Sequence, residues 1–189
     1  MRLTSSEAVN AEILIVVRAR DIIMNHEHFM KKALHEAEQA LKAGEFPVGC
    51  VMVYEDEVIV TGIRKHSTRK GRNELDHAEM VALRKLDVMD RPLDRSKITL
   101  YCTMEPCLMC YAALILNGIQ HIVYAYEDAM SGGTGLDLKG LKPLYRNMSI
   151  KITPYILRDE SLKLFKEFFS DPANDYWKNS ILAQYTLRE

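Results

Sequence analysis

The sequence is poor in several features that mark specialised classes of protein. It has four cysteines, six prolines and one tryptophan in 189 residues, and no apolar run long enough to cross a membrane or to form a signal segment. The most apolar stretch near the start, residues 12–23 (EILIVVRARDII), is interrupted by Glu12, Arg18, Arg20 and Asp21. We therefore expect a cytoplasmic protein that makes no contact with membranes.

An excess of charge of one sign is also missing. The 25 basic residues nearly balance the 26 acidic ones, which leaves a formal net charge of -1. Without a global positive field, the chain as a whole is not attracted to nucleic acid, so any such contact must be made by a local patch. The basic run at residues 64–72 (RKHSTRKGR) is one candidate, although charge runs of this kind are usually solvated loops.

The cysteines are too few for a disulfide framework. In a chain without a secretory segment, they are typical of a reducing compartment, where closely spaced thiols more often hold a metal. Cys50 and Cys102 lie in apolar stretches, and we expect them to be small buried side chains. The closely spaced pair, Cys107 and Cys110, is the candidate for metal binding.

The chain does have a regular alternation of helical and strand-like apolar patterns. These patterns predict helices at 29–41, 76–86, 106–116 and 159–169, a hairpin of strands at 46–54 and 58–61, and strands at 97–103, 121–126 and 149–157. Strands that alternate with helices predict an α/β fold whose sheet carries helices on both faces. No repeat or linker divides the chain, so we expect one domain over residues 1–189, in which residues 1–25 fit either a helix or a strand.

The two close cysteines stand at the predicted start of the helix 106–116. Proline is favoured at the first helical position because it has no N–H to leave unpaired, so Pro106 places Cys107 and Cys110 in the first turn. Their spacing of three puts both sulfur atoms on one face, and the positive end of the helix dipole stabilises them as thiolates. Two thiolates are half of a typical zinc site.

A nitrogen ligand is available at the start of another predicted helix, in the segment DHAEM (76–80). His77, Cys107 and Cys110 make three protein ligands, the number found in catalytic zinc sites, where the fourth position is left for water. Zinc lowers the pKa of that water from about 15.7 to about 7. Glu79 can then take the proton from the water. These residues favour catalysis over a structural zinc site, which would have four protein ligands.

The motif H-x-E at residues 77–79, followed by P-C-x-x-C at residues 106–110, is the signature of zinc deaminases that act on nucleobases. With these motifs the chain resembles the cytidine-deaminase-like superfamily, and most closely its tRNA-adenosine deaminase branch. The likeness covers residues 28–170, from the hairpin EFPVGCVMVYEDEVI to the helix ILRDESLKLFKEFF, and leaves residues 1–25 and 171–189 as extensions.

The resemblance implies a three-layer αβα fold with a mixed five-stranded sheet, and a homodimer. It implies that zinc is held by His77, Cys107 and Cys110, with Glu79 as the proton shuttle. In that reaction a hydroxide adds to the amino-bearing carbon of the ring, Glu79 protonates the ring nitrogen and the leaving amine, and ammonia departs. The leading substrate is adenosine in tRNA, which becomes inosine.

Departures from the pattern of the family fall on positions that concern the substrate. Where the family has Gly-x-Asn after its second strand, this chain has Gly62-Ile63-Arg64, and the nearby Asn73 lies too close to the zinc-binding histidine to be the same element. The segment 171–179 (DPANDYWKN) is similar instead to the aromatic segment with which small cytosine deaminases cover their pocket. The candidate substrate-binding residues are Arg64, Asn73, Asp128 and Trp177.

The sequence also allows two other functions. A deaminase of a small base or nucleoside (cytosine, guanine, adenosine or cytidine) needs a pocket that the tail closes around Trp177, whereas an RNA substrate needs an open groove with basic residues. A non-catalytic partner subunit is disfavoured because Glu79 is present. If RNA is the substrate, the residues expected to neutralise phosphates are Arg64, Lys65, Arg69, Lys70 and Arg72.

Overall fold

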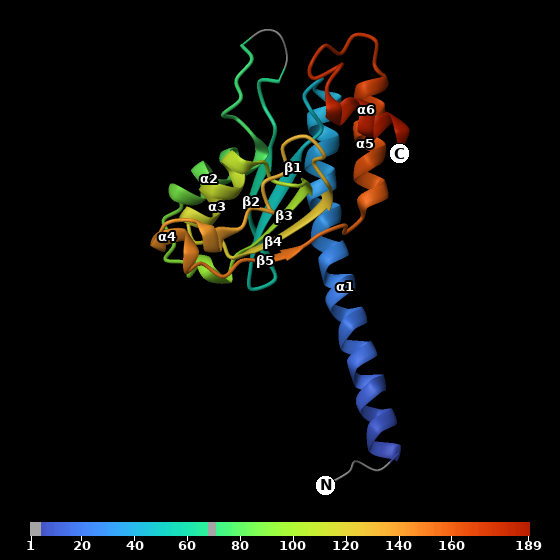
Figure 1. Ribbon diagram of the computed structural model, residues 1–189, viewed down its shortest axis with the longest axis vertical. Helices are drawn as coiled ribbons and strands as arrows, with labels where there is room; N and C mark the ends of the chain where they lie inside the picture. The colour runs from blue at the N-terminus through green and yellow to red at the C-terminus, as the bar shows by residue number, and fades with distance from the viewer. Residues whose placement is uncertain (1–4, 68–70) are drawn as a thin grey trace.

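A mixed five-stranded sheet forms the centre of the molecule (Figure 1). The computed structural model describes residues 5–67 and 71–189, with side chains from residue 23 onward. The strands, in the order β2-β1-β3-β4-β5, are β1 (Gly49–Tyr54), β2 (Glu57–Ile63), β3 (Thr99–Met104), β4 (His121–Tyr126) and β5 (Lys151–Thr153). β1 is antiparallel to β2 and β3, whereas β3, β4 and β5 are parallel to one another.

Helices cover both faces of the sheet, which confirms the predicted αβα layers (Figure 1). One face carries α1 (Ser5–Lys42) and α5 (Arg158–Ser170), and the other carries α2 (Ala78–Asp87) and α3 (Leu108–Leu116). The short elements are η1 (Arg95–Lys97), η2 (Leu138–Gly140), α4 (Pro143–Arg146) and α6 (Ile181–Arg188). Among the described helices, none combines the length and the apolar composition that a membrane span requires.

The alternation of side chains along the strands explains the two-sided packing. On β1, Cys50 and Met52 belong to the apolar cluster that contains α2 and α3, whereas Val51 and Val53 belong to the cluster that contains α1. Successive side chains of a strand point to opposite faces, so a strand buried on both sides is apolar at every position. The sheet thus holds α2 and α3 against one face, with their first residues at the same edge of the molecule.

The structure adds to the prediction mainly at the two ends of the chain and at β5. α1 continues through residues 5–25 and projects beyond the sheet (Figure 1), while residues 1–4 lie outside the described part of the chain. β5 is shorter than the predicted strand 149–157 because Pro154 has no N–H to donate, and Tyr155 and Leu157 adopt left-handed φ angles of 66° and 55°. The terminal helix α6 was not predicted, although Ser180 marks its start as an N-cap that accepts from the Ala183 N–H.

Candidate metal centre and active site

The three predicted metal ligands meet at the starts of two helices. His77 is the N-cap residue of α2, Cys107 is the N-cap residue of α3, and Cys110 lies in the first turn of α3. The Nδ1 atom of His77 is 3.6 Å from Sγ of Cys107 and 3.5 Å from Sγ of Cys110. Because α3 begins at Leu108 and not at Pro106, Cys107 precedes the first turn, where the prediction placed it inside.

These separations fit a tetrahedral zinc ion. Zinc–sulfur bonds of about 2.3 Å and zinc–nitrogen bonds of about 2.0 Å, at a tetrahedral angle, put a nitrogen and a sulfur ligand roughly 3.5 Å apart. The three ligand atoms all lie within 4.8 Å of one another, and this is the only such group of histidine, cysteine or acidic residues in the part of the chain that the structure describes. The side chains therefore suit a metal with three protein ligands.

The two thiols differ in acidity. The neighbouring Cys110 thiol, followed by His77, lowers the pKa of the Cys107 thiol to about 4. The same contact, together with burial, raises the pKa of the Cys110 thiol well above its usual value. The contact thus favours the thiolate form of Cys107 and the protonated form of Cys110, and binding of a cation would favour the thiolate form of both.

Glu79 lies in the first turn of α2 and is only 3% exposed. Its Oε1 atom accepts a hydrogen bond of 3.5 Å from the Cys102 thiol, and its Oε2 atom has no hydrogen-bond partner among the described residues. Burial raises the pKa of the Glu79 carboxyl group. A buried carboxyl group with a free oxygen atom is suited to accepting and returning protons. Cys102 and Cys50 are fully buried, as predicted.

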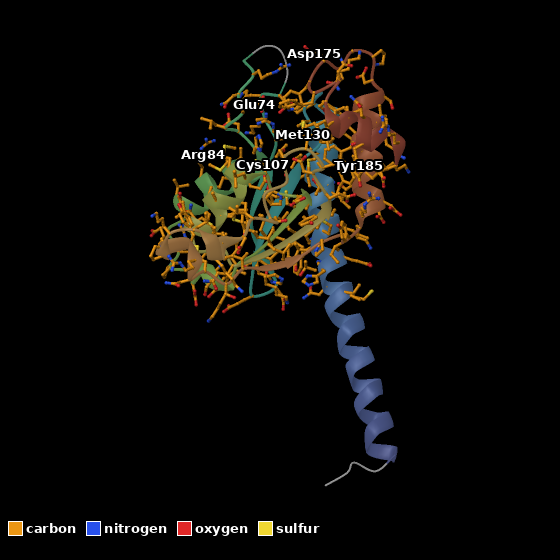
Figure 2. The ribbon with its side chains drawn as sticks, in the orientation of Figure 1. Glu74, Arg84, Cys107, Met130, Asp175 and Tyr185 are labelled. Carbon is orange, nitrogen blue, oxygen red and sulfur yellow. The ribbon has the colours of Figure 1, made fainter. Side chains whose placement is uncertain are left out.

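A cavity of about 80 Å³ opens above these residues. His77, Glu79 and Cys107 line one side of it, and Tyr176 and Trp177 of the C-terminal tail line the other. Figure 2 shows Cys107 between the pair α2/α3 and this tail. The tail thus lies against the pocket. Trp177 is 44% exposed and has a left-handed φ of 52°, and its contact with a substrate stays a prediction.

The structure corrects the prediction for Arg64. Its side chain lines the cavity but is only 2% exposed, and its Nη2 atom donates to Glu74 Oε2 at 3.0 Å and to the hydroxyl group of Tyr176 at 3.1 Å. A guanidinium group that is buried and paired with a carboxylate in this way cannot neutralise a phosphate at the surface. The prediction that Arg64 neutralises a phosphate is therefore wrong.

Asn73 does not reach the cavity. Its amide group donates to Asp76 and accepts from the Leu75 N–H, so it stabilises the turn before α2. Among the other residues of the basic run, Lys65 is exposed and Arg72 forms an ion pair of 3.5 Å with Asp175. Arg69 and Lys70 lie outside the described residues.

Asp128 lines the cavity and also shapes the loop after β4. Its Oδ1 atom accepts hydrogen bonds from the N–H groups of Met130 and Ser131. The same loop is fixed to α3 because Gly133 donates to the Pro106 carbonyl group, and a Cβ atom on Gly133 would come within 2.6 Å of the Leu108 backbone. Asp128 therefore stabilises the loop that lines the pocket, and this role does not depend on any contact with a substrate.

Sequence reasoning missed Tyr176 and Glu74 as residues of the site. Tyr176 is 4% exposed, and its hydroxyl group donates to Glu74 Oε2 at 2.8 Å across 102 positions of the sequence. The aromatic pair Tyr176-Trp177 in the tail indicates a segment that lines the pocket, although the sequence prediction names only Trp177. No motif marks Glu74, and its partner Tyr176 comes from a distant part of the chain.

Comparison with known proteins agrees with the metal site described above. Residues 23–126 match the family described as the cytidine and deoxycytidylate deaminase zinc-binding region. The tRNA-specific adenosine deaminase 2 of Danio rerio is 36% identical over 151 residues, which cover 75% of this chain and 69% of the relative.

Two solved structures are also similar. One comes from studies of A-to-I editing by tRNA:A34 deaminases, with a TM-score of 0.57 and 26% identity over 72% of this chain and 98% of the other. The other is a guanine deaminase from Nitrosomonas europaea, with a TM-score of 0.55 and 25% identity over 75% of this chain and 83% of the other. The resemblance inferred from H-x-E and P-C-x-x-C is thus confirmed, and the chain belongs to the cytidine and deoxycytidylate deaminase family that shares this zinc-binding region.

Proposed function

We propose that this protein is a zinc-dependent hydrolytic deaminase that converts adenosine in tRNA to inosine and releases ammonia. The observation that carries the proposal is the placement of the buried Glu79 carboxyl group beside His77, Cys107 and Cys110, under one cavity. His77, Cys107 and Cys110 would hold the zinc. When bound, zinc supplies the Lewis acidity that makes a water molecule reactive at neutral pH.

Glu79 is proposed as the group that moves the protons. Its free Oε2 atom would accept a proton from the water, and its raised pKa lets the carboxyl group hold that proton inside the protein. Glu79 would then deliver this proton to the ring nitrogen, and would carry the remaining proton of the added hydroxyl group to the leaving amine. The ring carbon loses its amino group and gains the oxygen atom of the water, so one water is consumed and one ammonia is released.

The relatives support RNA as the substrate, since the Danio rerio relative is named as a tRNA-specific adenosine deaminase. One observation favours the second candidate, a small base or nucleoside. Tyr176 and Trp177 of the tail line the cavity, so the tail is placed to enclose a small substrate after binding. Arg64, Asp128 and Trp177 are the proposed contacts with the base, because these predicted residues line the cavity.

A substrate panel tests the proposal. Ammonia release is measured with an anticodon stem-loop that carries adenosine at the wobble position, and with free adenosine, guanine, cytosine and cytidine. We expect the highest kcat/KM with the stem-loop, inosine in the product by mass spectrometry, and a KM that rises with salt because phosphates are contacted. Turnover of a free base alone would establish the second candidate. Equal ammonia release by the protein and its Glu79→Gln variant would exclude catalysis by this site.

We also propose one domain over residues 1–189, a homodimer and a cytoplasmic location. The homodimer is supported by exposed leucines on α3, where Leu108 and Leu116 are 55% and 51% exposed. The location is supported by the four free cysteines, which suit a reducing compartment. Sedimentation of the purified protein at several concentrations tests the oligomeric state, and a monomer at micromolar concentration would contradict the homodimer.

A further inference from the structure

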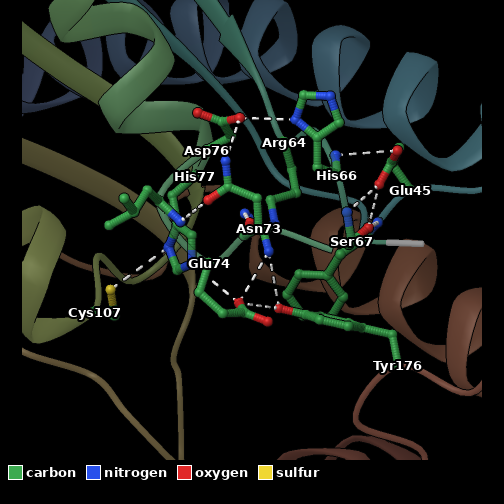
Figure 3. A network of polar contacts seen from close by, with 12 residues as sticks. Glu45, Arg64, His66, Ser67, Asn73, Glu74, Asp76, His77, Cys107 and Tyr176 are labelled. Carbon is green, nitrogen blue, oxygen red and sulfur yellow. Dashed lines mark hydrogen bonds and ion pairs between the residues drawn. The ribbon is translucent and has the colours of Figure 1, made fainter. Parts of the chain in front are cut away.

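The carboxylate of Glu74 joins three elements at the rim of the cavity. Its Oε2 atom accepts hydrogen bonds from Arg64 Nη2 at 3.0 Å, just after β2, and from the Tyr176 hydroxyl group at 2.8 Å, in the tail. The same oxygen lies 3.8 Å from Nε2 of His77, at the start of α2 (Figure 3). One acidic side chain thus connects the tail with a proposed metal ligand.

The two ring nitrogens of His77 face different surroundings. Nδ1 points to the sulfur atoms of Cys107 and Cys110, so it is the nitrogen that is placed to bind the metal. Nε2 faces Glu74, which is its only polar side-chain contact within the described part of the chain. When Nδ1 binds a metal, Nε2 carries the proton, and metal-binding histidines usually donate that N–H to a carboxylate, a carbonyl group or water.

We propose that Glu74 positions His77 for metal binding by accepting the Nε2–H, and that Arg64 and Tyr176 hold the Glu74 carboxylate where it can do so. The inference rests on the proposed metal role of His77 and not on the identity of the substrate. The separation of 3.8 Å is an ion-pair distance, longer than a hydrogen bond. The Glu74 side chain is 51% exposed, so we propose that its carboxylate rotates on the two donors to approach the Nε2–H once a metal binds Nδ1.

The burial of the two donors explains how they fix the carboxylate. Arg64 is 2% exposed and Tyr176 is 4% exposed, and the guanidinium carbon of Arg64 lies 5.7 Å from the centre of the Tyr176 ring. A buried guanidinium group needs a nearby negative charge, which Glu74 supplies. Because Tyr176 belongs to the tail that lines the cavity, a displacement of the tail would remove one of the two hydrogen bonds that hold Glu74. The metal site and the tail are coupled through this residue.

Zinc affinity of the full-length protein tests the role of Glu74. The metal-free protein is titrated with zinc in competition with a coloured chelator, and circular dichroism verifies that each variant is folded. We expect Glu74→Gln to lower zinc affinity by about 10- to 100-fold, as for other partners of metal-binding histidines, and to change the visible absorption of the cobalt-substituted protein. Tyr176→Phe keeps the ring and should lower the affinity in the same direction, by roughly two- to tenfold.

Asp76→Asn is the matched control. Asp76 is a carboxylate of the same loop, and it accepts hydrogen bonds from Asn73 and pairs with His66 and Arg84, but it has no contact with the His77 ring among the described residues. We expect zinc affinity within about twofold of wild type for this variant, because it disturbs only the loop. An equal loss in Asp76→Asn and Glu74→Gln would assign Glu74 a purely structural role.

Three further outcomes separate the inference from the proposed function. Wild-type zinc affinity and cobalt absorption in Glu74→Gln would overturn the inference and leave the metal site intact. If Glu74→Gln does not fold, wild-type zinc affinity in Tyr176→Phe would overturn the coupling to the tail. Wild-type zinc affinity in His77→Ala would instead contradict the metal role of His77, on which the proposed function depends.

Discussion

The two halves of the pocket are built in different ways. The inner half consists of His77, Glu79, Cys107 and Cys110, which two short motifs place at the starts of α2 and α3. The outer half consists of Arg64, Glu74, Tyr176 and Trp177, and the hydrogen bond between Arg64 and Tyr176 joins residues that are 112 positions apart. The comparison indicates that short sequence motifs position the proposed metal ligands and proton carrier. The residues that shape the outer pocket are positioned by contacts between distant parts of the chain.

The largest effect is expected from removal of a ligand in the inner half. We expect the wild-type protein to contain one zinc per chain, and His77→Ala and Cys107→Ala to contain essentially none, because two ligands do not retain the metal. Elemental analysis after gel filtration measures the content. If both variants contained as much zinc as the wild-type protein, the inner half would not be the metal site.

The next effect concerns the proton carrier. Glu79→Gln should retain zinc and the fold but lose turnover by about 10²- to 10⁴-fold, the usual contribution of general acid and base catalysis. Steady-state ammonia release measures the loss, and zinc analysis of the same sample verifies that the metal site is intact. Activity within a few-fold of wild type would exclude Glu79 from the reaction.

A third effect is expected where the loop after β4 contacts the inner half. A Cβ atom on Gly133 would lie 2.6 Å from Leu108 N and 2.9 Å from the carbonyl carbon of Cys107, so Gly133→Ala must displace the backbone that carries a ligand. We expect a loss of about 1–3 kcal/mol in the free energy of unfolding, as for other overpacked sites. Urea denaturation measures it. Gly135→Ala is the control, since nothing lies within 4 Å of its added Cβ atom, and equal stability of the two variants would contradict the steric explanation.

The smallest of these effects is expected at Trp177, in the outer half. Trp177→Ala should raise KM by about fivefold without changing zinc content, because stacking of a base on an aromatic ring is worth about 1 kcal/mol or more. Trp177→Phe retains an aromatic ring and should recover most of the affinity. The measurement is repeated at several salt concentrations with the stem-loop and with free bases. A large Trp177 effect together with a salt-independent KM would contradict the RNA substrate and support a small base.

The inner half could be predicted from the sequence because its residues are fixed by backbone geometry over a few positions. The spacing of Cys107 and Cys110 at the start of one helix, and of His77 and Glu79 at the start of another, already places their side chains. The same reasoning could not place Arg64. Its position in a basic run indicates a solvated residue, yet inside the protein Glu74 neutralises its charge and the Tyr176 hydroxyl group accepts a hydrogen bond from it.

The limits of the fold prediction have a similar cause. The strands β1, β3 and β4 are buried on both faces and are therefore continuous apolar runs that the sequence reveals directly. β5 ends early because of the local backbone around Pro154, and α6 is a short helix whose Leu182 and Ala183 become buried only when the tail folds back. The apolar pattern of the sequence predicts a helix or strand well where the element is fully buried. It predicts poorly where a single tertiary contact determines whether the element forms.

The backbone of Trp177 has a further consequence for variation at this position. A bulky L-residue in the left-handed region costs about 1–2 kcal/mol, which glycine does not incur. If Trp177 contacts the base as proposed, substitution by glycine would relieve the backbone strain and remove that contact in one step. Backbone strain and substrate affinity would then favour different residues at position 177.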